Sequence, residues 1–183
     1  MKFDLYPTVM CAEKLEIDND KLMERIDEFH KDTPSTNISN VGGYQGHNFE
    51  DEELVSAIIE ATPTMEGKQF LGDLICATWV NINKKDSFNT PHTHLDTQVL
   101  ISGTYYVKTP ENCGRIRFHD PRGSLIAAMP DYQYYYNGES ITYITPEPGM
   151  CLYFPPWLEH DVEPNNSDDI RVSVSFNILF PKT

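Results

Sequence analysis

The stretch that decides the fold is residues 148–160, PGMCLYFPPWLEH, in which a short apolar run ends near a histidine. Pro148-Gly149 has the composition of a turn, and two prolines follow the run at its other end. A run of five apolar and aromatic residues between such breakers is typical of a buried strand rather than a helix. We therefore expect a strand that places His160 just beyond its end.

Runs of the same kind recur along the second part of the chain. Turns rich in Pro, Asn, Asp and Gly separate them, and the gaps have the length of hairpins. Six or more such strands predict a double-sheet jelly roll. Besides residues 150–154, the runs are Ala77 to Asn83, Gln98 to Thr109, Gly114 to His119, Ser140 to Thr145 and Arg171 to Phe180.

The first part of the chain is predicted to be helical. Residues 19–29 place apolar side chains on one helical face, and a second amphipathic helix is expected to begin near Asn48 as its N-cap. Residues 39–46 form a glycine-rich loop between them. The expected class is α+β and mainly β, a double-stranded β-helix with the N-terminal helices packed on one sheet. We expect one domain over residues 1–183, with a helical part about 1–75 and a jelly-roll core about 76–183.

Composition limits the function. The 183 residues include 14 basic and 28 acidic ones, a net charge of −14, which argues against a nucleic-acid substrate bound through a broad basic face. No apolar run is long enough to span a membrane, and the N-terminus lacks a signal-peptide pattern, so the expected location is cytoplasmic. Four scattered cysteines predict reduced thiols. The substrate is then a small molecule or a protein, and the oligomeric state is left open.

A candidate metal site lies at His92-Thr93-His94-Leu95-Asp96 together with His160. In an extended segment His92, His94 and Asp96 leave the same face, because side chains alternate with period two. A polar turn at a strand end is the alternative for two histidines taken alone. Neutral imidazoles with a carboxylate and open coordination positions make the facial arrangement of non-haem Fe(II) oxygenases. His160 is well placed to meet the first pair across a barrel mouth.

A candidate anion site lies on residues 171–176, RVSVSF. Arg171 and Ser173 share one face of this strand, and the valines take the other. An arginine that points into a jelly roll requires a counter-anion, because a buried unpaired charge is costly. A dicarboxylate meets that need through a bidentate contact to the guanidinium and a bond from Ser173. The alternative is an outward-facing Arg171 in solvent.

Weaker candidates accompany these two sites. Asn83 shares a polar strand face with Asn81, and Tyr106 either donates to the same ligand or packs as a core aromatic. Arg115 and Arg117 either meet an acidic substrate or form surface ion pairs. We interpret three further histidines as structural or surface residues and an aromatic stretch as a loop or strand rim; these are His30, His47, His119 and Tyr132 to Tyr136.

The chain resembles a family of 2-oxoglutarate/Fe(II) oxygenases found in bacteria and tailed phages. The motifs that carry the resemblance span about residues 39–177: the loop SNVGG, then PHTH, SGTYYV, FPPWLEH and RVSVSFN. The resemblance implies a double-stranded β-helix that uses Fe(II), 2-oxoglutarate and O2. It also implies that His160 is a metal ligand and that Arg171 anchors 2-oxoglutarate, with no catalytic residue beyond the metal ligands.

The ligands in the first half remain open between two registers. The wider superfamily uses His-x-Asp, which His94-Leu95-Asp96 spells, whereas this family resembles Pro-His-x-His, which Pro91 to His94 spells. We favour His92, His94 and His160, with Asp96 as the alternative ligand. A third imidazole in place of a carboxylate leaves the site more cationic.

The expected function is a non-haem Fe(II)- and 2-oxoglutarate-dependent dioxygenase that hydroxylates an unidentified substrate and releases succinate and CO2. A cupin-type metalloprotein that does not use 2-oxoglutarate is the alternative, although cupins have a glutamate where this chain has Gln98 and have no use for Arg171. A non-catalytic jelly-roll module is a third hypothesis. It is disfavoured because structural metal sites prefer closed cages with thiolates.

Overall fold

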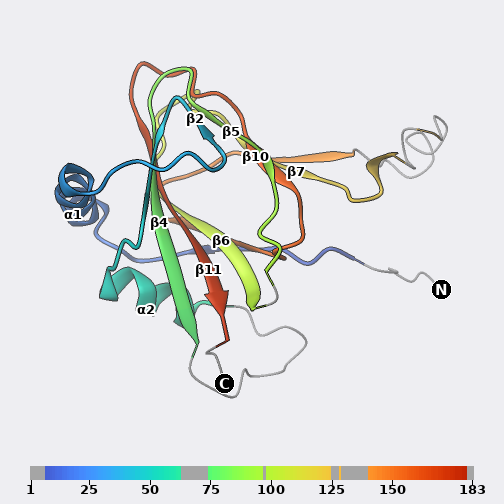
Figure 1. The fold of residues 1–183 in the computed structure, drawn as a ribbon, viewed down its shortest axis with the longest axis horizontal. Coiled ribbons are helices and arrows are strands. Elements are labelled where there is room, and N and C mark those ends of the chain that lie inside the picture. The colour runs from blue at the N-terminus through green and yellow to red at the C-terminus, as the bar shows by residue number, and fades with distance from the viewer. Residues whose placement is uncertain (1–6, 63–73, 97, 125–127, 129–139, 181–183) are drawn as a thin grey trace.

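The structure is a computed structural model that describes residues 7–62, 74–96, 98–124, 128 and 140–180. Its strand pairs are antiparallel and build two sheets (Figure 1). In chain order the elements are β1 Cys11–Lys14, α1 Asn19–Asp32, β2 Asn40–Val41, β3 Tyr44–His47, α2 Glu52–Glu60, β4 Ile75–Asn83, β5 Phe88–His92, β6 Val99–Lys108, β7 Ile116–His119, β8 Ile141–Ile144, β9 Met150–Phe154, β10 His160–Val162 and β11 Arg171–Leu179.

The two sheets have the strand arrangement of a jelly roll. The larger sheet has the order β1-β9-β6-β11-β4-β3, and the smaller has β2-β5-β10-β7-β8. Most neighbouring strands come from distant parts of the chain, as in β11, which pairs with both β4 and β6. This topology confirms the predicted double-stranded β-helix.

Strand β11 lies between the hydrophobic core and the cavity that contains the predicted ligand-binding residues. Its alternate residues Val172, Val174 and Phe176 are fully buried with the apolar faces of the helices. The intervening Arg171 and Ser173 line a cavity together with residues of the smaller sheet. In Figure 1, α1 and α2 lie on one side of β4 and β11, and β5, β7 and β10 lie on the other. The helices therefore cover the outer face of the larger sheet, as predicted.

The two helices follow the predicted pattern with one correction. Asp18 caps α1 by accepting the Lys21 amide hydrogen, and α2 begins at Glu52 behind the N-cap Asp51, not near Asn48. Asn48 has a φ of 62°, in the left-handed region, whereas an N-cap residue is extended. Asp51 is extended and its side chain accepts the Leu54 amide hydrogen. Acidic residues follow both Asn48 and Asp51, so the sequence pattern is compatible with either residue as the N-cap.

The structure also contains strands that the sequence did not predict. β1 precedes the first predicted helix, β2 and β3 lie almost entirely in the predicted glycine-rich loop over residues 39–46, and β5 lies in a segment before the predicted strand at Gln98. His160 begins β10 rather than following a strand end. The predicted aromatic loop at Tyr132 to Tyr136 lies outside the described residues. Within the described ranges, no helix is long and apolar enough to cross a membrane.

Candidate functional site

Three histidine side chains converge where β5 pairs with β10 in the smaller sheet. His92 ends β5 and His160 begins β10, and the antiparallel register places these residues opposite each other. Their ring centroids are 4.3 Å apart, and the ring of His94 lies 5.2 Å from His92 and 5.0 Å from His160. One ring nitrogen of each lies within 4.8 Å of the other two. The geometry suits three donors to a single ion.

Hydrogen bonds leave one nitrogen of each ring free. The Nδ1 atom of His92 lies 2.8 Å from the Thr90 carbonyl oxygen, and that of His160 lies 2.9 Å from the Leu158 carbonyl oxygen. A carbonyl only accepts, so Nδ1 must carry the hydrogen and donate it. The neutral ring then keeps its lone pair on Nε2, the form in which imidazole binds a metal.

His94 is held in the same way by two side chains. Its Nδ1 atom lies 2.9 Å from Asn177 Oδ1 and 2.9 Å from Ser102 Oγ, and the Ser102 hydroxyl also donates to Asn177 Oδ1. The amide oxygen accepts, so His94 also presents Nε2 to the cluster. Asn177 was not among the predicted site residues, although it continues the period-two pattern of Arg171, Ser173 and Ser175.

Asn177→Ala is expected to weaken metal binding by roughly 10- to 100-fold, because partners that orient a ligating histidine contribute on that scale. Asn177→Asp should restore affinity, since its carboxylate accepts the same Nδ1 hydrogen. Calorimetric titration of the metal-free variants with Mn(II) measures both effects. Equal affinity in Asn177→Ala and the wild type would contradict this role for the amide.

The environment keeps the three rings neutral. Burial lowers the pKa of His94 to about 4 and that of His160 to about 3, and the neighbouring His92 ring adds to both shifts. Burial also lowers the pKa of His92. Neutral imidazoles are required of metal ligands, so near neutral pH no proton has to leave before a cation binds.

Asp96 lies apart from the three rings. Its side chain is exposed, and its Oδ1 accepts the backbone hydrogen of Gln98 at 3.1 Å. Asp96 does not belong to the group of residues whose ligand atoms converge, which consists of His92, His94 and His160. The geometry therefore favours the three-histidine set over the His-x-Asp register.

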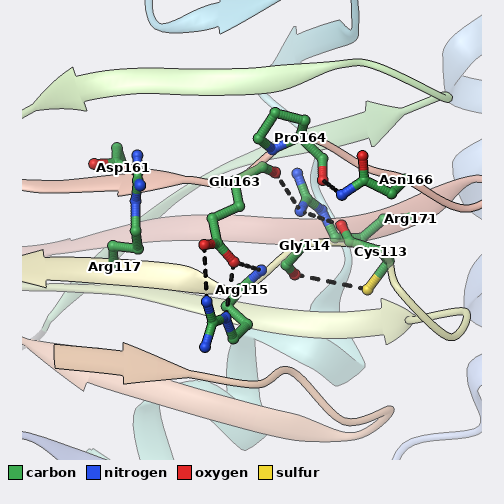
Figure 2. Close-up of polar contacts among 9 residues, drawn as sticks. All are labelled: Cys113, Gly114, Arg115, Arg117, Asp161, Glu163, Pro164, Asn166 and Arg171. Carbon is green, nitrogen blue, oxygen red and sulfur yellow. Dashed lines mark hydrogen bonds and ion pairs between the residues drawn. The ribbon is translucent and has the colours of Figure 1, made fainter.

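Arg171 lines the same cavity as the histidines. Its side chain is 2% exposed, and Nη1 donates to the carbonyl oxygens of Cys113 at 2.7 Å and Glu163 at 3.5 Å (Figure 2). Within the described part of the chain it has no carboxylate partner, and burial lowers its pKa. A guanidinium nevertheless stays charged in a protein, so this cavity carries a positive charge that calls for an anion.

The remaining predicted ligand-binding residues also line this cavity, namely Ser173, Asn83 and Tyr106. Burial raises the pKa of Tyr106, which keeps its hydroxyl a hydrogen-bond donor. Asn83 donates to Asn89 at 3.4 Å. Gln45, which was not a predicted site residue, adds a buried Oε1 atom without a partner among the described residues. Such an oxygen suits an N–H or O–H group of a bound molecule.

The other predicted candidates lie outside the cavity. Arg115 pairs with Glu163 at 2.8 Å, which is a surface ion pair as one alternative predicted, whereas Arg117 pairs at 2.6 Å with Asp161, which is buried. His119 also contacts Asp161, at 2.6 Å. His47 stacks on Trp79, and His30 lies against Tyr44. These contacts agree with the structural interpretation of the three histidines.

The donor set fits a non-haem iron site. Three neutral nitrogens on one side of a cavity leave positions open for further ligands, and Arg171, which has no carboxylate partner in the described part of the chain, lines the same cavity. Residues 77–177, which contain these groups, match the model of a protein family described as "Putative 2OG-Fe(II) oxygenase". The chain belongs to this family. It is therefore an Fe(II)- and 2-oxoglutarate-dependent oxygenase, and the cupin alternative without 2-oxoglutarate is not favoured.

Solved structures share the fold of this oxygenase. A prolyl hydroxylase from Trichoplax adhaerens, in complex with a hypoxia inducible factor peptide, is 12% identical with a TM-score of 0.65, covering 93% of this chain and 83% of its own. A Pseudomonas putida prolyl-4-hydroxylase is 12% identical with a TM-score of 0.62, covering 96% and 94%. HygX from Streptomyces hygroscopicus, with nickel and 2-oxoglutarate bound, is 8% identical with a TM-score of 0.60, covering 94% and 83%. No curated protein sequence matches the oxygenase.

Proposed function

We propose that His92, His94 and His160 hold Fe(II) through Nε2, and that Arg171 binds the distal carboxylate of 2-oxoglutarate. The observation that carries the proposal is the single cavity that contains three neutral imidazoles and one buried unpaired guanidinium. The guanidinium, which has no carboxylate partner among the described residues, can bind an anion, and the three converging imidazoles can bind a cation. A dicarboxylic keto acid with a metal ion satisfies both.

The side chains around Arg171 would orient the cosubstrate. Ser173 and Tyr106 offer hydroxyl hydrogens, and Asn83 offers an amide, all on the wall that Arg171 shares. Bound iron, 2-oxoglutarate and O2 together supply the oxidation, which yields succinate and CO2 and transfers one oxygen atom to the substrate as a hydroxyl group. The residues of the chain would hold the metal ion and the distal carboxylate of the keto acid, and would exclude water from their surroundings.

We infer that the substrate is a small molecule or a protein side chain that is hydroxylated. Related structures are known with a peptide and with the small molecule hygromycin B. The net charge of −14 disfavours nucleic acid. We also propose that residues 1–183 act as one oxygenase domain, since strands from the first 75 residues complete both sheets.

Succinate formation tests the proposed function. Purified protein with Fe(II), 2-oxoglutarate and O2 should form succinate even without a substrate, at a low rate that NMR detects. Omission of Fe(II), 2-oxoglutarate or O2 should each abolish the product. Protein that takes up Fe(II) but neither binds nor consumes 2-oxoglutarate would contradict the proposal.

A further inference from the structure

Gly114 lies where residues 112–115 pack against residues 163–166, close to the side chain of Arg171. Its φ is +85°, in the left-handed region that glycine adopts without strain. A Cβ atom at this position would lie 2.4 Å from the Glu163 carbonyl oxygen and 2.7 Å from that of Pro164. Both are backbone atoms, so no side chain can swing away to make room. The close approach therefore requires glycine.

Hydrogen bonds connect the two segments on both sides of this contact. The Glu163 amide donates to the Arg115 carbonyl at 2.9 Å, and the Asn166 amide donates to the Asn112 carbonyl at 2.9 Å. The Arg115 side chain also donates twice to the Glu163 carboxylate, as Figure 2 shows. This ion pair is partly exposed and adds little energy, but it is compatible with only one register.

This contact places two carbonyl oxygens within hydrogen-bond distance of Nη1 of Arg171. One comes from Cys113, directly before Gly114, and the other from Glu163, directly across from it (Figure 2). Carbonyl dipoles orient a guanidinium without cancelling its charge, whereas a carboxylate in the same place would neutralise it. Only Nη1 is engaged within the described residues, so the other donors of Arg171 remain available to a ligand.

We propose that Gly114 is a positioning residue for cosubstrate binding. Its missing side chain lets the carbonyls of Cys113 and Glu163 hold the Arg171 guanidinium in its binding orientation before 2-oxoglutarate arrives. A group held in advance loses less conformational freedom on binding, and affinity rises accordingly. The inference rests on the proposed role of Arg171 as the anchor of the distal carboxylate.

Gly114→Ala tests the proposal, with Gly149→Ala as the matched control. Gly149 has a nearly equal φ of +82°, so alanine costs similar backbone strain there, but its Cβ would meet only the flexible Lys14 side chain. The probes are 2-oxoglutarate and pyruvate, titrated calorimetrically into Mn(II)-loaded protein. Pyruvate carries the same keto-acid end but lacks the distal carboxylate.

Gly114→Ala should weaken 2-oxoglutarate binding about tenfold, the effect of losing one charge-assisted hydrogen bond. Pyruvate binding in this variant, and both affinities in Gly149→Ala, should stay within roughly twofold of wild type. Equal losses for the two keto acids would overturn the proposal, because that result indicates general damage. If Arg171→Met weakens 2-oxoglutarate binding and Gly114→Ala does not, the result contradicts the positioning role of Gly114 but supports Arg171 as the anchor of the distal carboxylate. If neither variant changes 2-oxoglutarate binding, the result contradicts the proposed role of Arg171 as the anchor.

A measurement on the wild type keeps the proposal testable if Gly114→Ala does not fold. The chain has five arginines, so their guanidinium signals can be separated by NMR in protein labelled with ¹⁵N-arginine. Without 2-oxoglutarate, the Nη1 hydrogens of Arg171 should already show slow rotation and protection from solvent exchange. Free rotation before the cosubstrate binds would overturn the proposal.

Discussion

His92→Ala is expected to lose bound iron and succinate formation together, whereas Asp96→Ala keeps both. Removal of a partner outside the coordination shell already costs roughly 10- to 100-fold, so loss of a ligand should cost at least about 100-fold. The ring of His92 lies 4.3 Å from that of His160, while the exposed Asp96 carboxylate accepts the Gln98 amide hydrogen. Iron per chain after anaerobic loading and desalting, together with succinate by NMR, measures the two effects.

Asp96→Ala is also the control for folding and for loss of iron during purification, because it removes an exposed side chain from the same segment. Its iron content and turnover should stay within about twofold of wild type, as for most surface substitutions. The reverse result, with iron lost in Asp96→Ala and kept in His92→Ala, would establish the His-x-Asp register. Loss in both variants would show that the segment as a whole matters rather than one ligand.

Arg171→Met is expected to raise the Kd of 2-oxoglutarate by about 100-fold, because a bidentate contact to a carboxylate is lost in a buried site. The thermal stability should change little. The variant removes a buried charge that has no carboxylate partner among the described residues, and this offsets the lost bonds to the Cys113 and Glu163 carbonyls. Calorimetry on Mn(II)-loaded protein and a thermal melt measure the two quantities.

Arg122→Met is the matched control for charge. It removes one positive charge from an exposed arginine that pairs with Asp120 on the surface, so the Kd should be unchanged. Unaltered 2-oxoglutarate binding in Arg171→Met would contradict the assignment of the anchor. A large fall in the melting temperature would indicate instead that Arg171 is a structural residue.

Local patterns were sufficient for much of the fold. The period-two alternation of β11 correctly predicted that Val172 and Val174 face away from Arg171 and Ser173. The apolar stripe of residues 19–29 likewise predicted α1. Such patterns depend on only a few neighbouring residues and on one buried face, so they are legible in a single sequence.

Other elements depend on partners far away in the chain. β10 has three residues, too few for a periodic pattern, and it exists because His160 pairs with both His92 and Phe118. β2 has two residues and pairs with β5. For such strands the neighbours supply the hydrogen bonds, and their identity cannot be obtained from local composition.

The sequence by itself determined which residue types are present: histidines two apart, a third after the apolar strand, and an arginine on an alternating strand. Only the tertiary structure decided how they are held. It directs Nδ1 of each histidine to a protein acceptor, places Asp96 at the surface, and brings Cys113 and Glu163 to Arg171 across Gly114. The physical reason is that side-chain type and spacing are local properties, whereas hydrogen-bond partners, burial and close backbone contacts depend on which distant segments become neighbours.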